Sequence, residues 1–151
     1  MNLYLDTSAL VKRYIQEPGS LDLRVQFEKA DMQATAQITF VEAIAALAKA
    51  VRTGNIARKN ASQIMVILQQ EWANLQNIEI SDELVNQAAM LAWQHDLRGY
   101  DAVHLASALA WQARFGEPIT MTTYDLQLWT IAQQVGLAVY PLDLPALLAT
   151  W

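Results

Sequence analysis

Cysteine is absent from this chain of 151 residues, and glycine and proline are scarce, with five and four copies. The absence of cysteine excludes disulfide bonds and thiolate metal sites. It is compatible with a reducing compartment, and we expect a cytoplasmic protein. A secretory leader is not expected, because the first residues lack a basic stretch followed by a long apolar one. No apolar run approaches the ~18 residues of a membrane span, so we expect no membrane association.

Charged residues are also few, at 17% of the chain, whereas hydrophobic residues make up 54%. This hydrophobic content is high for a soluble monomer, and it predicts that some apolar surface meets a partner. A homodimer and a groove filled by a second protein are both compatible with it.

The net charge of −5 is unevenly distributed. Residues 1–60 hold eight Lys/Arg and six Asp/Glu, whereas residues 61–151 hold two and nine. A uniformly acidic protein would bind nucleic acid poorly. The basic residues of the first part could still form a local patch, although a solvated helix face explains any one of them. These residues are Lys12, Arg13, Lys49, Arg52, Arg58 and Lys59.

Short apolar segments alternate with segments of helical periodicity along the whole chain. Strands are expected at 3–5, 33–36, 78–80, 119–122 and 137–140, and helices at 7–16, 20–30, 39–53, 57–75, 82–95, 101–115 and 126–135. This alternation predicts a three-layer α/β/α fold with a short, mostly parallel central sheet. No linker interrupts the pattern, so we expect residues 1–151 to form one domain.

Four carboxylates stand where an apolar segment gives way to a helical one. They are Asp6, Glu42, Asp101 and Asp125. In open α/β sheets, ligands bind beyond the carboxyl ends of the strands, so the topology can bring all four acids to one edge. Close carboxylates repel by about 4 kcal/mol per pair at an effective dielectric constant near 20. Such a cluster therefore calls for a divalent cation, a shared proton or a basic partner.

Each acid also has a purely structural interpretation. Asp6, Asp101 and Asp125 could cap the helices that follow them. Glu42 stands three residues after Thr39, which matches a capping box. Helix capping explains any one acid well, but it does not explain why two of them follow apolar strands at the edge of a crevice.

Hard oxygen ligands suit Mg²⁺ or Mn²⁺, which are held by a few carboxylates together with substrate phosphate. Such an ion activates water and neutralises phosphoryl oxygens, which points to hydrolysis of a phosphodiester. The sequence has no Ser-His-Asp set that stands out by spacing, no glycine-rich phosphate loop and no zinc pattern.

Four segments in order resemble the motifs of PIN domains, and most closely those of VapC-type toxins. The segments are Leu3-Tyr4-Leu5-Asp6-Thr7-Ser8-Ala9-Leu10-Val11-Lys12, Thr39-Phe40-Val41-Glu42-Ala43, Arg98-Gly99-Tyr100-Asp101-Ala102-Val103-His104-Leu105-Ala106 and Thr123-Tyr124-Asp125. The resemblance covers nearly the whole chain and implies a PIN-like fold. It also implies a Mg²⁺- or Mn²⁺-dependent endoribonuclease that a VapB-type antitoxin neutralises.

The resemblance further implies roles for individual residues. Asp6 and Asp101 would be the most direct metal ligands, and Glu42 and Asp125 would complete the acidic site through water or a second ion. The hydroxyls of Thr7, Ser8 and Thr123 would brace the pocket, although capping and turn closure explain them equally well. By its spacing, His104 shares a helix face with Asp101; it could approach the substrate phosphate, but we expect a packed wall residue. Lys12, Arg13 and Arg98 would contact RNA phosphates.

The sequence departs from some PIN domains in one respect, because no further acid follows Asp125 one turn later. The site is therefore expected to hold one tight metal ion, with a second arriving only with RNA. Two other hypotheses remain open at this point. One is a phosphohydrolase that uses Asp6 as a nucleophile, although Ser8 stands where such enzymes usually carry a second Asp. The other is a PIN-like binding module that has lost activity.

Overall fold

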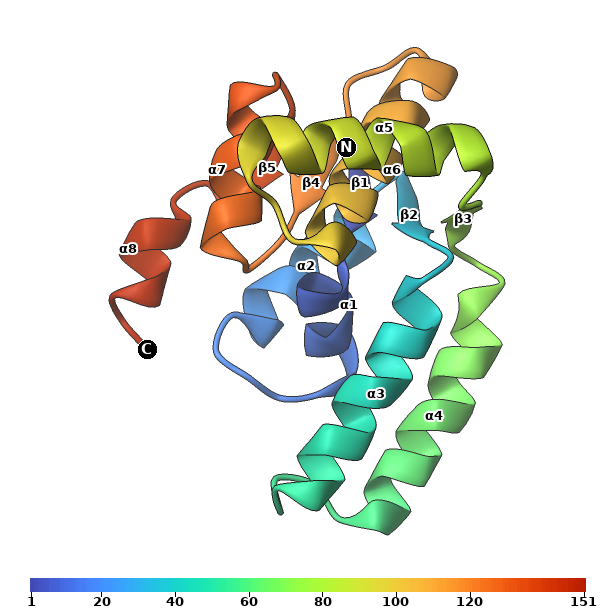
Figure 1. Cartoon of the computed structure of the whole chain (residues 1–151). Coiled ribbons are helices and arrows are strands. Elements are labelled where there is room, and N and C mark those ends of the chain that lie inside the picture. Colours follow the sequence, from blue (N-terminus) through green and yellow to red (C-terminus); the bar gives the residue numbers. More distant parts are fainter.

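The computed structural model describes residues 1–151, which form a parallel five-stranded sheet covered by helices (Figure 1). The strands are β1 (Asn2–Leu5), β2 (Met32–Ala36), β3 (Gln76–Ile78), β4 (Thr120–Thr122) and β5 (Ala138–Tyr140). The helices are α1 (Thr7–Tyr14), α2 (Ser20–Lys29), α3 (Thr39–Arg52), α4 (Arg58–Trp72), α5 (Asp82–His95), α6 (Gly99–Phe115), α7 (Leu126–Gln134) and α8 (Leu144–Leu148). The three-layer α/β/α fold expected from the sequence is confirmed.

The strand order in the sheet is β3-β2-β1-β4-β5, and all four pairings are parallel. The chain first winds from β1 outward to β3 and then returns to β4 on the other side of β1. Because crossovers between parallel strands are right-handed, α1 to α4 cover one face, and α5 to α7 cover the other. The winding direction therefore reverses between β1 and β4, which is where open α/β sheets bind their ligands.

Strand β1 is the centre of the core. Leu3, Tyr4 and Leu5 have no solvent-exposed surface, because helices cover both faces of the strand and β2 and β4 flank it. Full burial on both faces explains why this strand reads as a continuous apolar run rather than as an alternating pattern. The buried strand therefore fixes the position of the turn that follows it.

Helices α3 and α4 form an antiparallel arm that extends away from the sheet (Figure 1). Gly54, with φ of +78°, lies in the short turn between them. The base of the arm is tied to α1, because Arg13 donates to both carboxylate oxygens of Glu71, at 2.9 and 3.1 Å. Tyr14 donates to the same carboxylate at 2.8 Å.

The observed elements depart from the expected ones mostly by a few residues at their ends; for example, α1 ends at Tyr14 and α4 at Trp72, earlier than expected. The five-residue helix α8, which follows Pro141, was not expected. Strand β3 ends at Ile78, where the expected strand began, and α6 starts at Gly99 rather than at residue 101. No helix in the structure combines the length and the hydropathy that a membrane crossing requires.

Candidate active site

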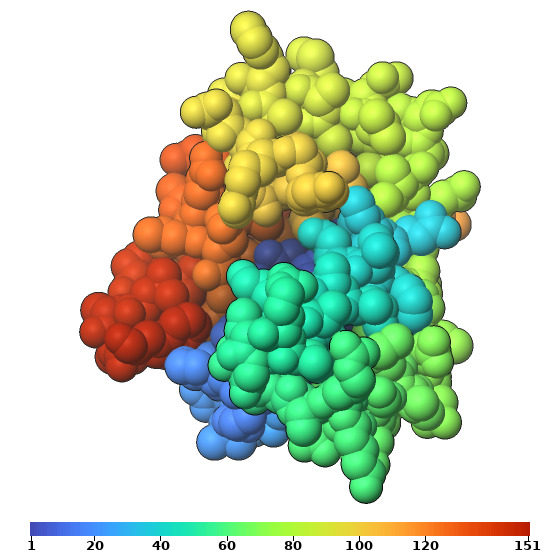
Figure 2. All heavy atoms as spheres, turned by 60° about the horizontal axis from the view of Figure 1, so that its bottom comes forward, coloured from blue at the N-terminus to red at the C-terminus, as the bar shows by residue number.

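A hollow opens at the carboxyl ends of β1 and β4 (Figure 2). The dark blue N-terminal segment is visible at its floor, and teal, yellow and orange segments border it. The two central strands are joined at this point, because the backbone N–H of Asp6 donates to the carbonyl of Thr122 at 3.2 Å. The four predicted acids come from the turns and first helical turns around this edge.

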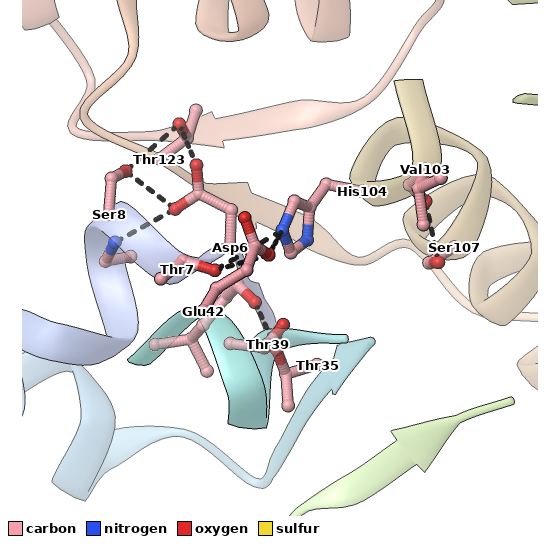
Figure 3. A network of polar contacts seen from close by, with 12 residues as sticks. Asp6, Thr7, Ser8, Thr35, Thr39, Glu42, Val103, His104, Ser107 and Thr123 are labelled. Carbon is pink, nitrogen blue, oxygen red and sulfur yellow. Dashed lines mark hydrogen bonds and ion pairs between the residues drawn. The ribbon is translucent and has the colours of Figure 1, made fainter. Parts of the chain in front are cut away.

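Asp6 lies at the floor of the site and is only 4% exposed. Its Oδ1 accepts from the Ser8 hydroxyl at 2.7 Å and from the Ala9 backbone N–H at 2.9 Å. Its Oδ2 accepts from the Thr123 hydroxyl at 2.6 Å (Figure 3). The bond to Ala9 makes Asp6 the N-cap of α1, so the carboxylate is a cap and a site residue at once.

The charge of Asp6 is not balanced by a direct ion pair. Burial raises the pKa of its carboxyl above the usual value, and the nearby His104 and the three hydrogen bonds offset this effect only in part. The donors around it are neutral hydroxyls and a backbone amide. A buried carboxylate in such surroundings is stabilised by a cation brought close to it.

Glu42 reaches the same region from the first turn of α3. Its Oε1 accepts from the Thr7 hydroxyl at 2.8 Å and lies 2.8 Å from Nε2 of His104 (Figure 3). The other ring nitrogen of His104, Nδ1, lies 3.0 Å from the hydroxyl of Tyr4. A neutral ring with its proton on Nε2 satisfies both contacts, since it donates to Glu42 and accepts from Tyr4.

This arrangement fixes Glu42 in its charged form. Burial alone would raise the pKa of the Glu42 carboxyl, but the hydrogen bonds from His104 and Thr7 lower it below the usual value. Burial also keeps the pKa of Tyr4 well above its usual value, so its hydroxyl remains a donor. His104 is therefore a buried wall residue, as expected, and one that orients an acid of the site.

The capping-box interpretation of Glu42 is wrong. Helix α3 has no side-chain cap, and its N-cap residue is Ile38. The Thr39 hydroxyl accepts instead from Thr35 at 2.7 Å, inside the core. The Glu42 carboxylate points across the site to Thr7 and His104, not back to the start of its own helix.

Asp101 and Asp125 lie on the other side of the site and share one arginine. Nε of Arg98 donates to Oδ2 of Asp101, and its terminal nitrogen donates to Oδ2 of Asp125, both at 2.8 Å. The Arg98 side chain is 70% exposed, so solvent screens both ion pairs. Asp125 also caps α7 through Leu128, whereas Asp101 is not a cap, because Arg98 occupies that position in α6.

Thr123 connects the two sides. Its hydroxyl donates to Asp6 and accepts from the backbone N–H of Asp125 at 3.1 Å. Ser8 supports the same turn, because its hydroxyl accepts from the backbone N–H of Tyr124 at 2.9 Å. The hydroxyls of Thr7, Ser8 and Thr123 all contact the acids or their turns.

Two of the three expected phosphate-binding cations have internal partners instead. Lys12 is 4% exposed; its ammonium donates to Glu17 and to the carbonyl of Pro18, both at 3.0 Å, and lies over the ring of Tyr124. Arg13 pairs with Glu71 at the base of the arm. Sequence reasoning missed these pairings, although Glu17 lies close enough in sequence to suggest the first of them.

The chemistry of the four acids suits a hard divalent cation, since all of them offer carboxylate oxygens. In the arrangement seen, no three His, Asp or Glu side chains converge on one ion position. The hydrogen bonds explain why the acids stay apart, because Arg98 binds Asp101 and Asp125, and His104 binds Glu42. Arg98 supplies positive charge beside Asp101 and Asp125, whereas no cation forms a direct ion pair with Asp6.

Comparison with known proteins gives a family and a fold. The sequence model of a family described as PIN domain matches residues 3–127, which include all four acids. Ribonuclease VapC45 of Mycobacterium tuberculosis is 33% identical over 143 residues, which are 94% of this chain and 96% of that protein. Ribonuclease VapC49 of the same species matches with the same identity and coverage.

Solved structures share the fold at low sequence identity. The sarcin-ricin loop cleaving toxin VapC20 of Mycobacterium tuberculosis superposes with a TM-score of 0.63 at 14% identity, over 90% of this chain and 96% of that one. VapBC2 of Rickettsia felis, solved with a DNA fragment from its promoter, gives a TM-score of 0.62 at 14% identity, over 92% and 97% of the two chains.

Proposed function

The chain belongs to the PIN domain family, and from that premise we propose that it is a VapC-type ribonuclease, the toxin of a toxin–antitoxin pair. The reaction is hydrolysis of RNA phosphodiester bonds. The observation that carries this proposal is the position of Asp6, a buried carboxylate with no direct ion pair at the reversal point of the sheet. Three further acids reach the same edge from separate elements.

We propose that a Mg²⁺ or Mn²⁺ ion binds among these acids, with Asp6 and Asp101 as the most direct ligands. Asp125 and Glu42 complete the site through water or a second ion. When bound, the ion would lower the pKa of a water molecule and neutralise phosphate oxygens. Arg98 would then release Asp101 and Asp125, because its charge is no longer needed between them. Its exposure lets it turn toward the RNA backbone, where a guanidinium binds phosphate well.

The remaining side chains keep the acids in place. Thr7 and His104 hold Glu42 in its charged form, while Ser8 and Thr123 orient both oxygens of Asp6. Because these bonds exist before any ligand arrives, Asp6 and Glu42 need little reorganisation to bind one.

The test of the activity is sequencing of RNA ends after induction of the protein. New 5′ ends should appear with the native chain and not with Asp101→Asn, whereas Asp82→Asn, a charge-matched change at an exposed acid of α5, should behave like the native chain. Growth arrest should follow the same pattern. Cleavage by Asp101→Asn at the native rate would refute the assigned role.

Metal binding is tested separately, by calorimetric titration with Mn²⁺. The native chain and Asp82→Asn should bind the ion, and Asp6→Asn should bind it at least ~10-fold more weakly. If the native chain shows no binding with or without RNA, the hypothesis of an inactive binding module takes the place of the enzyme.

We also propose a VapB-type antitoxin as the protein partner and a homodimer as the assembly. Trp93, on α5, is 87% exposed, and Met90 and Tyr100 nearby in sequence are 57% and 63% exposed. Large exposed apolar side chains of this kind mark protein interfaces. Size-exclusion chromatography with light scattering tests the dimer, and Trp93→Ser should weaken it if this surface is the contact.

A further inference from the structure

The tip of the α3–α4 arm is the most basic part of the molecule. Between residues 43 and 70 the sequence contains no Asp or Glu. The same stretch carries four cations, Lys49, Arg52, Arg58 and Lys59. With those four set aside, the rest of the chain has six Lys/Arg and fifteen Asp/Glu, a net charge of −9. The positive charge is therefore concentrated at one end of an acidic protein.

These four side chains are free to meet a ligand. All four residues are exposed, and none of them takes part in an ion pair. Arg58 and Lys59 open α4, whose N-cap makes no side-chain hydrogen bond. Cations at a helix N-terminus oppose the helix dipole, so these two residues cost the isolated arm stability. An anion at the tip would relieve this repulsion.

A groove beside the tip adds an apolar surface to the charge. It has a volume of about 410 Å³ and lies between α3 and α4. Arg52 and Arg58 line it together with apolar side chains such as Leu47, Val51 and Met65. A single-stranded nucleic acid offers the matching combination, because its bases have apolar faces and its backbone carries one negative charge per nucleotide.

The arm connects this surface to the hollow at the carboxyl ends of β1 and β4, which is the crevice that holds the four acids. Helix α3 carries Glu42 in its first turn and Lys49 and Arg52 in its last. Ten residues of helix separate Glu42 from Arg52, which is a rise of ~15 Å. In Figure 2 the teal α3 borders the hollow, and the arm leads from there toward its green tip. An RNA strand that leaves the crevice along α3 would reach the cations.

We propose that the tip is a second binding site for the RNA backbone, formed by Lys49, Arg52, Arg58 and Lys59. It rests on the proposed ribonuclease function. RNA long enough to span the crevice and the tip is held at both ends, whereas a short oligonucleotide touches only the crevice. The tip therefore favours long substrates without taking part in the chemical step.

The test compares the double variant Lys49→Ala/Arg52→Ala, and separately Arg58→Ala/Lys59→Ala, with the control Lys29→Ala/Arg114→Ala. The control removes the same charge from exposed positions outside the arm. Fluorescence anisotropy in EDTA measures the binding of a labelled RNA of about thirty nucleotides, several times the smallest single-strand site of ~4 nucleotides. Thermal unfolding verifies that every variant folds.

Each tip variant should bind the long RNA roughly 10-fold more weakly at 0.1 M salt. The slope of log K against log salt should flatten by ~1.4, which is the loss of two phosphate contacts. With metal present, KM for long RNA should rise, while cleavage of an oligonucleotide of ~4 nucleotides should not change.

Equal effects of the tip and control variants would overturn the proposal while leaving the nuclease intact. Unchanged RNA binding with weaker binding of the antitoxin would assign the tip to the protein partner and also overturn it. A native chain that neither binds nor cleaves RNA would refute the proposed function together with this inference.

Discussion

The two sides of the crevice hold their carboxylates in different ways. On the inner side, Asp6 and Glu42 are fixed by hydroxyls, a backbone amide and His104, most of which are buried. On the outer side, Asp101 and Asp125 share one exposed arginine. Buried hydrogen bonds keep a geometry, whereas an exposed ion pair exchanges readily. The inner acids are therefore preorganised, and the outer acids can adapt to a ligand.

The largest effect should come from removing the charge at the centre of the inner side. Asp6→Asn should lower the rate of RNA cleavage by at least about 10³-fold, because the buried carboxylate that attracts the cation is lost. Single-turnover cleavage of one RNA with Mn²⁺ measures this effect. A loss below 10-fold would mean that the outer acids suffice, and that the distinction between the two sides has no catalytic meaning.

His104 tests how far the inner side depends on its buried bonds. His104→Ala removes the ring that contacts the Tyr4 hydroxyl, leaves Glu42 with Thr7 as its one remaining partner and creates a cavity, so the free energy of unfolding should fall by about 2–4 kcal/mol. His104→Gln is the matched control, since its amide can donate to Glu42 and accept from Tyr4. Urea unfolding measures both. Equal destabilisation by the two variants would show that packing, not hydrogen bonding, holds Glu42.

A variant of Arg98 tests whether its guanidinium competes with a metal ion for Asp101 and Asp125. Without the guanidinium, Asp101 and Asp125 have no competing cation, so Arg98→Gln should bind Mn²⁺ about 3- to 10-fold more tightly. Calorimetry in the absence of RNA measures the change, and Arg114→Gln controls for the loss of one positive charge. Weaker Mn²⁺ binding by Arg98→Gln would contradict the exchange and would make Arg98 a support of the metal site.

The smallest effect concerns stability and pH. Because folding raises the pKa of Asp6 above 3.8, the folded state holds this proton more tightly than the unfolded state. Ionised Asp6 therefore destabilises the fold above its folded pKa. The penalty fades as the pH falls from that pKa to 3.8. Without metal, the unfolding temperature of Asp6→Asn relative to the native chain should rise by ~3 °C, or about 1 kcal/mol, between acid and neutral pH, because the amide lacks the ionisation that penalises Asp6.

Ionisation of Glu42 should stabilise the fold, which is the opposite of its effect at Asp6. Its pKa is lowered from 4.5, so its charge contributes stability above that value, and this contribution is lost as the pH falls through the folded pKa. Glu42→Gln should therefore unfold at a lower temperature at neutral pH, with the difference from the native chain shrinking in acid. Thermal scans from neutral pH down to pH 3 follow both variants. Parallel shifts of Asp6→Asn and Glu42→Gln would contradict the assigned environments.

The sequence was sufficient to predict the fold class and the approximate positions of the acids. Asp6 and Asp125 follow apolar strands, and the parallel order of β1 and β4 brings them together. Their interpretation as helix caps is also confirmed, because one carboxylate can accept from a backbone N–H and still face a crevice. For Asp6 and Asp125, helix capping and a place in the acidic site are therefore compatible.

The partners of the acids could not be predicted in the same way. Tyr4 and His104 are 100 positions apart, and Arg98 reaches Asp125 across 27 positions, so no local spacing indicates either contact. The capping box failed for a different reason, because the competing contact is local. Thr39 fits the local pattern, but a buried contact with Thr35 on the neighbouring strand occupies its hydroxyl.

The bond between Asp6 and Thr123 also bears on when this protein can first act. It joins residues 117 positions apart, and β1 lies in the sheet between an early strand and a late one. A ribosome adding about 5–20 residues per second needs on the order of 10 s to pass from one partner to the other. Throughout that time the nascent chain has the first acid but not the turn that orients it. The site is thus a late product of translation, and a chain whose synthesis stops before Thr123 lacks the turn that orients its first acid.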